Sequence, residues 1–296
     1  MKGTQTAYIP DKRVAPYLFL LPFLLFFLVF RVGPILWSLL ISFTNWTGMN
    51  ELQFIGLKNY ARIFKDPRFW TATGNTIYFV VIYNLIMVSL AIVLAVILHS
   101  AFVKGKRFYR SVYFAPIAMS LPVVAMVFDL LLAKRSGLLS ILLGYFGITM
   151  NVRWLSDTSL AMWAIIIMRV WRGIGYYCAY FLAGLTGIPE EIYESAKVDG
   201  ASPLRIFFQI TLPLLRPMLL FVIIMSTILS FQLFDEPWVL TQGGPADATL
   251  TLQIYLYQTS FLEGHLGNGS AISYLMTILM MGASVFYVKR LGEKEG

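Results

Sequence analysis

Six long apolar stretches dominate this sequence of 296 residues. A helix that crosses a bilayer needs about 20 mostly apolar residues, because the hydrocarbon core offers no water to its backbone groups. Hydrophobic residues make up 58% of the chain and charged residues 13%, roughly half the charged share of a soluble domain. We therefore expect an all-α integral membrane protein that contacts membrane lipid, with six transmembrane helices at 16–44, 72–98, 109–133, 159–184, 213–235 and 268–288.

The first stretch is expected to stay in the membrane as an anchor. It is too long for the apolar core of a signal peptide and lacks a clear small-residue cleavage site. Arg31, Gly33 and Pro34 lie within it and predict a kink, or an exit near the outer surface.

Lysine and arginine between the stretches set the expected orientation, since cytoplasmic loops are enriched in them. Most of these residues fall inside if both termini are cytoplasmic, and the loop 235–265 then lies outside with no Lys or Arg. The first outer loop, with Lys58, Arg62, Lys65 and Arg68, goes against this rule. The net charge of +8 is spread over these loops, and no basic face with stacking aromatic residues predicts binding to nucleic acid.

The segment "EEIYESAKVDGASPLRIFFQITLPLL" interrupts the apolar text with charges at helical spacing, on the side expected to be cytoplasmic. Its first turns carry three carboxylates, which suit the positive end of a helix dipole: Glu190, Glu191 and Glu194. Gly200 should end this helix, and Ser202 followed by Pro203 suits the start of another. The segment predicts a short helix, a turn and a second short helix, with an ordinary solvated loop as the alternative.

The order of residues in this segment resembles the EAA loop of ATP-binding-cassette (ABC) importer permeases. That loop reads E-A-A, three residues, G, nine residues, I-x-L-P, and this chain departs from it only at Ser195. In addition, 54–76 resembles the first outer loop of carbohydrate-type permeases. The segment 230–245, "SFQLFDEPWVLTQGGP", resembles the F-x-x-F-D…T-x-G-G-P stretch of one permease half of maltose-type sugar importers. The resemblance covers nearly the whole chain.

This resemblance implies an ABC type I importer transmembrane domain in a bacterial cell (inner) membrane, with both termini cytoplasmic. It divides the chain into 1–70 (cytoplasmic N-terminus, first transmembrane helix and first outer loop), 71–287 (ABC transmembrane type-1 core domain) and 288–296 (cytoplasmic tail). The implied function is a translocation path for a sugar, an oligosaccharide or glycoside. The implied partners are a second permease subunit, two ATP-binding subunits that hold ATP and Mg, and an extracytoplasmic solute-binding protein.

In this family the EAA loop is a coupling helix that docks into a groove of the ATPase. The resemblance implies this role for Glu190, Glu191, Glu194, Ala196, Asp199 and Gly200. Ile192, Ala196 and Val198 are expected to supply apolar contacts, with the glutamates pairing at the rim.

Neither an active site nor a metal site is expected in this chain. It has no phosphate-binding loop G-x-x-x-x-G-K-[ST], so nucleotide chemistry should belong to another polypeptide. His99 and His265 lie far apart, and the single Cys178 excludes an intrachain disulfide. We therefore expect a transporter subunit without a cofactor of its own.

Charged and aromatic residues within the apolar stretches are candidates for the substrate path, because intramembrane charges are costly and sugars stack on aromatic faces. Arg169 and Arg172 share one helical face and serve either substrate or an ion pair, with lipid headgroups or an acid such as Asp235. The full expected set is Arg169, Trp171, Arg172, Tyr176, Phe231, Gln232, Asp235 and Trp238.

The outer loop is expected to contact the binding protein through a flexible backbone at Gly243, Gly244 and Pro245. Three alternative functions stay open. The paired arginines suit a phosphorylated polyol such as a glycerol phosphate as cargo. An ion-coupled secondary transporter would often show repeated halves and central acids, which this sequence lacks. A membrane enzyme would need a catalytic constellation.

Overall fold

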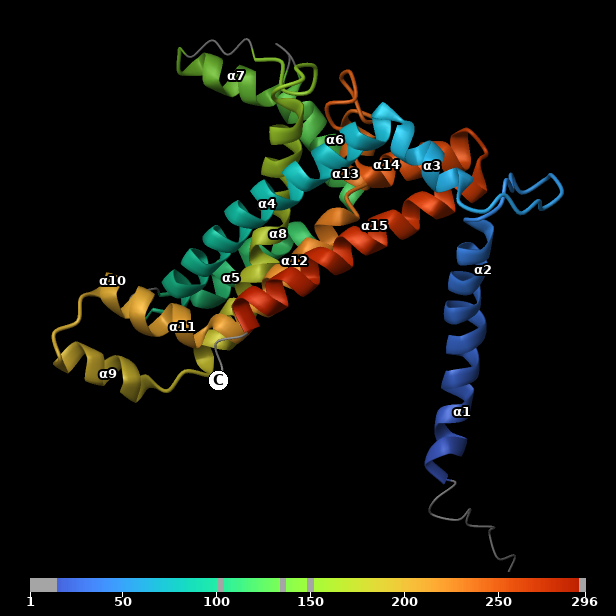
Figure 1. Cartoon of the computed structure of the whole chain (residues 1–296). Coiled ribbons are helices and arrows are strands. Elements are labelled where there is room, and N and C mark those ends of the chain that lie inside the picture. Colours follow the sequence, from blue (N-terminus) through green and yellow to red (C-terminus); the bar gives the residue numbers. More distant parts are fainter. Residues whose placement is uncertain (1–14, 101–103, 134–136, 148–151, 293–296) are drawn as a thin grey trace, which may run out of the picture.

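The computed structural model describes residues 15–100, 104–133, 137–147 and 152–292, and within these ranges the chain is helical (Figure 1). Thr44 and Phe54 form one isolated bridge. The helices are α1 Ala15–Phe27, η1 Leu28–Val32, α2 Gly33–Ile41, α3 Lys58–Lys65, α4 Pro67–His99, α5 Lys106–Ala118, α6 Leu121–Leu132, α7 Leu138–Tyr145, α8 Ala161–Thr186, α9 Glu190–Val198, α10 Pro203–Ile206, η2 Phe207–Thr211, α11 Leu212–Leu214, α12 Arg216–Phe231, α13 Asp235–Leu240, α14 Leu252–Tyr257, η3 Gln258–Leu262, α15 Leu266–Tyr287 and η4 Val288–Gly292.

The expectation of an all-α membrane protein is confirmed in the described part of the chain. Four helical segments are long and apolar enough to cross a membrane: Pro16–Ile41, Pro67–His99, Arg216–Leu240 and Leu266–Arg290. A fifth span results if the bent pair Phe108–Ala118 and Leu121–Leu132 is counted as one. Helix α8 is 26 residues long but contains two arginines and is not among these candidates.

The expected single helix at 109–133 is wrong, because the chain bends by 98° between α5 and α6. Pro116 lies in the last turn of α5 and Pro122 in the first turn of α6. Proline donates no backbone hydrogen bond and pushes the preceding residue away from helical geometry. Met119 and Ser120 adopt extended backbone between the two helices, with ψ angles of 141° and 142°.

The first helix continues through the position where an exit was expected. The π-helical turn η1 (Leu28–Val32) joins α1 to α2, and Pro34 occupies the first turn of α2, so the helix runs on to Ile41. Such a turn accommodates a local change in helical register. The resulting rod projects from the bundle (Figure 1), and no residue of its most apolar 18-residue stretch is buried.

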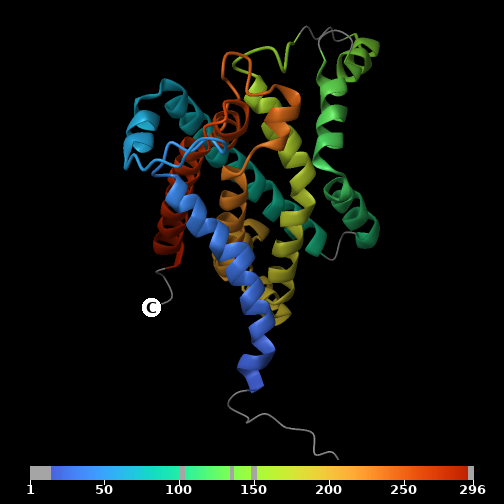
Figure 2. The ribbon, with the colours of Figure 1, turned by 90° about the vertical axis from the view of Figure 1, so that its right-hand side faces the viewer.

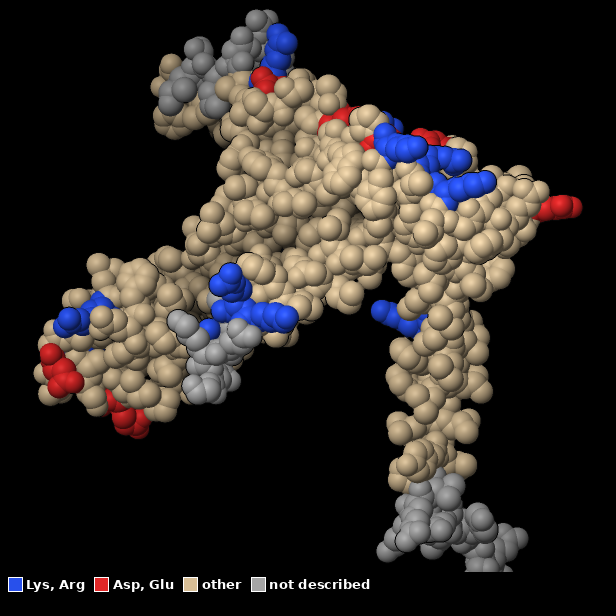
Figure 3. All heavy atoms as spheres, viewed as in Figure 1, with Lys and Arg blue, Asp and Glu red and all other residues tan. Residues whose placement is uncertain are grey.

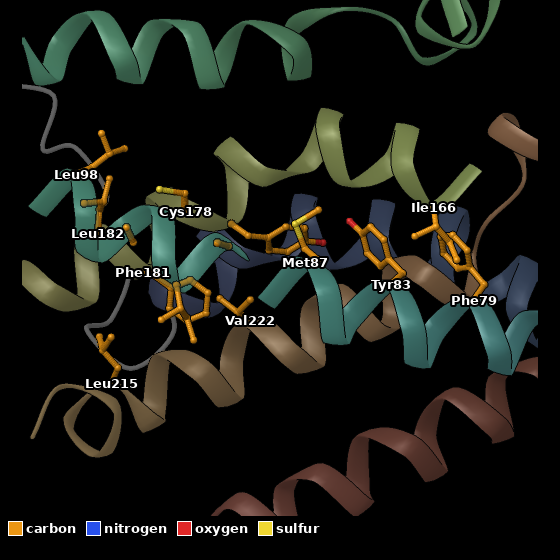
Figure 4. Close-up of a cluster of buried hydrophobic side chains, with 14 of the residues drawn as sticks. Phe79, Tyr83, Met87, Leu98, Ile166, Cys178, Phe181, Leu182, Leu215 and Val222 are labelled. Carbon is orange, nitrogen blue, oxygen red and sulfur yellow. The ribbon is translucent and has the colours of Figure 1, made fainter. Parts of the chain in front are cut away.

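The largest core cluster lies where α4, α8 and α12 pack together, and Figure 4 shows its side chains pointing toward one another. Phe79, Met87 and Phe181 are fully buried there. Helix association in membranes depends on close packing, which small residues permit. A Cβ at Gly175 of α8 would overlap the carbonyl oxygen of Tyr113, so α5 and α8 touch backbone to backbone at this point.

The two ends of the bundle carry different elements. One end holds α9, the N-terminal end of α1 and the C-terminal end of α15 (Figures 1 and 2). The opposite end holds α3, α7 and α14, where a second core cluster joins Ile63 of α3 to Leu252 of α14 and Ile272 of α15. On the face shown in Figure 3, most charged side chains gather toward these two ends.

Candidate functional site

The predicted helix–turn–helix at 190–205 is present and projects from one end of the bundle (Figure 1). Helix α9 begins at Glu190, with Pro189 as its N-cap, and ends before a turn in which Gly200 has a φ of +73°. The hydroxyl of Ser202 accepts a hydrogen bond from the Arg205 amide at 3.3 Å and caps α10. Each local sequence signal therefore acts where it was expected.

The acidic residues of this segment are exposed, and so are two of the three apolar residues expected to supply contacts. The exposed carboxylates are Glu190, Glu191, Glu194 and Asp199. Val198 is 87% exposed and Ile192 is 37% exposed. Ala196, also expected to contact the partner, is only 7% exposed in this chain, and that contact stays a prediction. Its carbonyl accepts a hydrogen bond from the Ala201 amide at 3.0 Å, and Ala196 thus shapes the turn from inside.

A continuous helical path links this segment to the bundle. Helices α10, η2 and α11 follow one another without a break and lead into α12 at Arg216. The Thr211 hydroxyl lies 3.5 Å from that of Tyr193 on α9, so α9 is also tied back to this path. α9 therefore contacts this path through Tyr193 as well as through the turn at 199–202.

Arg169 of α8 lies at a meeting point of four helices. Its guanidinium donates to the carboxylate of Glu236 in an ion pair and to the carbonyl oxygen of Leu229 at 3.2 Å. It also lies 5.9 Å from the centre of the Tyr83 ring, within cation–π range. Glu236 is 1% exposed, so this pair connects α4, α8, α12 and α13 inside the protein.

The acid expected opposite Arg169 was Asp235, and the structure replaces it with Glu236. Both residues fall in the first turn of α13, where Asp235 points to the surface and Glu236 points inward. Glu236 was not identified from the sequence, although it is an acid in apolar text. Tyr83 and Asn84 of α4 were also missed, and Asn84 accepts a hydrogen bond from the buried Ser226 of α12.

The side chains of Arg172 and Trp171 have different surroundings, although the two residues are adjacent in α8. An Arg172 Nη2 donates to the carbonyl oxygen of Met119 at 3.3 Å, at the break between α5 and α6. Its buried Nε has no partner among the described residues. Trp171 is 44% exposed and, with Trp163, lines an apolar hollow of about 290 Å³ between α4 and α8. Its ring centre lies 5.6 Å from that of Phe128 on α6.

Tyr176 forms an aromatic polar group with its neighbours on α8. Its hydroxyl lies 2.9 Å from that of Tyr180, and its ring packs edge-on against Tyr177 and Tyr180. The Tyr180 ring contacts Phe221 of α12, with ring centres 5.3 Å apart. One face of α8 carries both charge and aromatic hydroxyls, because four residues follow one another at spacings of three or four: Arg169, Arg172, Tyr176 and Tyr180.

The turn between α12 and α13 combines buried and exposed candidates. Phe231 is buried, whereas Gln232 and Asp235 are exposed. Trp238 stacks on Phe234 with ring centres 5.6 Å apart and meets Tyr257 edge-on at 5.0 Å. The structure therefore gathers Arg169 with the α12–α13 turn and leaves Trp171 on another surface.

The outer loop, where a flexible backbone was expected at Gly243, Gly244 and Pro245, carries several hydrogen bonds; its contact with the binding protein stays a prediction. Gly243 is buried, and its carbonyl accepts from the Thr249 amide at 3.1 Å. The Thr249 hydroxyl donates to the Gly244 carbonyl at 2.7 Å. Gln242, Ala246 and Asp247 have positive φ angles, which non-glycine residues adopt only when their surroundings impose them.

Side chains from the start of α4 brace this loop. Asn75 donates to the carbonyl oxygens of Asp247 and Leu250 at 2.8 and 3.0 Å. Arg68 pairs with the Asp247 carboxylate at 3.1 Å. Nearby, the Tyr255 hydroxyl donates to Asp66 at 2.6 Å, and burial together with this hydrogen bond raises the pKa of Tyr255.

Comparisons with known proteins show similarity to membrane components of transport systems. A model of the family described as "Binding-protein-dependent transport system inner membrane component" matches residues 87–293. The probable ABC transporter permease protein YurN of Bacillus subtilis is 35% identical over 292 residues, covering 97% of this chain and 100% of the relative. The arabinooligosaccharides transport system permease AraP of Bacillus subtilis is 34% identical, covering 97% of this chain and 91% of the relative.

Two further matches extend this similarity. The lactose transport system permease LacF of Rhizobium radiobacter is 35% identical, covering 93% of each chain. The crystal structure of a bacterial ABC transporter that imports the acidic polysaccharide alginate matches with a TM-score of 0.85 at 21% identity. It covers 96% of this chain and 98% of that chain, which shows a shared fold.

Proposed function

The chain belongs to the family of binding-protein-dependent transport system inner membrane components, and from this premise we propose the following role. It is the membrane-spanning subunit of an ATP-driven importer, and it forms the translocation path for an oligosaccharide or glycoside together with a second permease. ATP hydrolysis belongs to separate ATPase subunits, since the sequence has no phosphate-binding loop.

The exposed helix–turn–helix at 190–205 is the observation that carries this proposal. It presents Glu190, Glu191, Glu194 and Val198 away from an otherwise apolar bundle, as a docking surface for a partner requires. We assign it as the coupling helix, with Asp199 and Gly200 forming its exit. ATP-driven closure of the ATPases would displace α9, and α10 to α12 would carry that movement into the bundle as a rigid body.

The remaining topology follows from this assignment. With α9 in the cytoplasm, both termini lie inside and the braced loop 241–250 lies outside, where it meets the solute-binding protein through Gly244 and Pro245. Six spans result when α5–α6 counts as one broken span and α8 as another. We divide the chain into 1–70, the core domain 71–287 and the tail 288–296. The exposed rod of α1 and α2 supports a contact with the second permease.

The face of α8 that carries Tyr176 and the α12–α13 turn with Gln232 and Asp235 are the proposed sugar contacts. Aromatic rings pack on the C–H faces of sugars, and amide or carboxylate groups bind their hydroxyls. Because Glu236 neutralises Arg169, the two arginines do not form a free phosphate clamp. This pairing favours a sugar over a phosphorylated polyol as the cargo.

The test is ATP hydrolysis by the purified complex in nanodiscs, with its partner permease, ATPase and solute-binding protein, across a panel of sugars. Glu194→Lys and Gly200→Val should abolish the stimulation by liganded binding protein and leave membrane insertion intact. Lys289→Glu, which reverses an exposed charge at the same end of the bundle but outside α9, is the matched control and should keep the stimulation. Full stimulation in the α9 variants would refute the coupling assignment.

A further inference from the structure

The short helix α3 (Lys58–Lys65) carries a basic face that the proposed transport function does not use. Lys58, Arg62 and Lys65 are spaced so that they share one side of the helix, and all three are exposed. Figure 3 shows Lys and Arg side chains gathered over α3 at this end of the molecule. No Asp or Glu of the described ranges lies within salt-bridge distance of these three residues.

The opposite side of α3 is locked into the protein. Asn59 is 2% exposed and donates to the carbonyl oxygens of Ser42 and Thr44 at 2.9 and 2.7 Å. Ile63 is fully buried in the cluster that α3 shares with α14 and α15. The helix cannot roll without breaking these contacts, so the direction of its basic face is fixed.

Exposed aromatic side chains lie beside this basic face. Phe64 is 48% exposed and Trp70 is 55% exposed, with ring centres 6.1 Å apart. The Trp70 indole donates to the Phe64 carbonyl at 2.9 Å, which holds the two together. Trp70 belongs to the first turn of α4, at the end of a candidate membrane span. Tryptophan is enriched at this depth, where the membrane meets water.

We propose that α3 is an interfacial helix that binds the phosphate headgroups of anionic lipid, such as phosphatidylglycerol. The buried side of α3 packs on the protein, and its exposed basic side, with exposed Phe64 and Trp70 beside it at the end of a membrane span, suits a segment at the membrane surface. Lys58, Arg62 and Lys65 bind the headgroups, while Phe64 and Trp70 enter the boundary between headgroups and acyl chains. Only the assignment of α3 to the outer leaflet rests on the proposed function.

A soluble acidic partner fits the same charges less well. Such a partner would pair with the basic side chains, but it would leave Phe64 and Trp70 facing lipid or water. The lipid surface satisfies both sets of residues. It also gives a role to the basic residues of this loop, which oppose the usual bias of lysine and arginine toward the cytoplasmic side.

The experiment uses the complete transporter complex in nanodiscs of phosphatidylcholine with phosphatidylglycerol. The phosphatidylglycerol retained after mild detergent extraction is counted by native mass spectrometry. The triple variant Lys58→Gln/Arg62→Gln/Lys65→Gln should retain about tenfold less, since each basic residue adds to the attraction for an anionic surface. Arg153→Gln is the matched control. Arg153 is exposed and close to Asp157, whose pKa is lowered mainly by hydrogen bonds from Ser159 and in part by Arg153.

A second readout does not depend on extraction. Brominated phosphatidylglycerol should quench the tryptophan fluorescence of the wild type more than that of Trp70→Phe, and the triple variant should lose this excess. Unchanged lipid retention and quenching in the triple variant would overturn the proposal. So would a loss of binding-protein stimulation with lipid retention unchanged, because the face would then dock that protein. A wild type that retains lipid but shows no stimulated ATP hydrolysis would refute the transport function alone.

Discussion

Arg169 of α8 and Glu236 of α13 form a buried ion pair across 67 positions of sequence. The same guanidinium also binds the carbonyl oxygen of Leu229 and lies over the Tyr83 ring. Charges within a membrane protein are costly unless they are paired, and here the two charges pair inside the bundle through Glu236 Oε1, while the buried Oε2 has no hydrogen-bond partner among the described residues. The pair therefore fixes the position of α13, and with it the start of the outer loop, relative to α4 and α8.

The first prediction concerns the stability of this pair. Arg169→Met or Glu236→Met alone leaves an uncompensated buried charge, which typically costs about 3–5 kcal/mol. The double variant removes both charges and should regain most of the lost stability. Thermal midpoints of the detergent-solubilised protein, followed by size-exclusion chromatography, measure this difference. Additive losses in the double variant would show that the two residues do not act as a pair.

The double variant also separates a structural role of Arg169 from substrate binding. If the arginine only positions α13, the stable double variant keeps sugar uptake near the wild-type rate. A stable double variant without uptake would assign Arg169 to the substrate instead. We expect uptake to persist, because Glu236 occupies the guanidinium.

Local signals in the sequence predicted much of the helical framework. The prolines and glycines around 190–205 act at the cap and turn positions inferred for them, because such preferences depend only on neighbouring residues. Pro116 and Pro122 could have revealed the break between α5 and α6. The break was missed because 109–133 is mostly apolar. Hydropathy indicates that a segment lies in lipid, but it does not indicate whether the segment is one unbroken helix.

Contacts between distant elements could not be predicted in the same way. Choosing Glu236 over Asp235 as the partner of Arg169 requires knowing which side of α13 faces the bundle. If α13 began one residue earlier or later, the inward and outward positions of these two acids would change. The hydrogen bonds around Gly243 and Gly244 could not be predicted for a similar reason. The loop is held by the side chain of Asn75 on α4, and Asn75 lies 172 positions before Asp247 in the sequence.

The second prediction tests the turn after α9. Gly200 has a φ of +73°, and a Cβ there would meet nothing within 4 Å. Only backbone strain therefore opposes substitution, and left-handed geometry costs most residues about 1–2 kcal/mol while Asn tolerates it. Gly200→Asn should keep most sugar uptake, and Gly200→Val should lose it at equal abundance in the membrane. Equal uptake by both variants would show that the turn geometry does not matter.

The third prediction compares two glycines of α8. Alanine at Gly175 would collide with the Tyr113 backbone, which cannot yield without moving α5. Alanine at Gly184 would meet the Leu215 side chain at 2.8 Å, which can rotate away. Gly175→Ala should therefore lower the thermal midpoint clearly more than Gly184→Ala. Gly282→Ala, with nothing within 4 Å, is the control and should leave it unchanged or raise it.

The fourth prediction tests the brace of the outer loop. Asn75→Ala removes the donor to two carbonyl oxygens, and each unsatisfied polar group of this kind costs about 1–3 kcal/mol. Arg68→Gln removes an ion pair whose side chains are 42% and 38% exposed, and exposed pairs contribute little. Asn75→Ala should accelerate amide hydrogen exchange in 241–250 and weaken affinity for the binding protein, whereas Arg68→Gln should change both only slightly.

Thr71→Ala is the matched control for this prediction. Thr71 lies one turn before Asn75, and its hydroxyl donates only to the Pro67 carbonyl of its own helix at 3.2 Å. Exchange in 241–250 should therefore stay at the wild-type rate. Faster exchange in Asn75→Ala with unchanged affinity would place the binding-protein contact elsewhere, because the loop would then be loosened without consequence for docking. Unchanged exchange would mean that the backbone bonds of Thr249 to Gly243 hold the loop without help from α4.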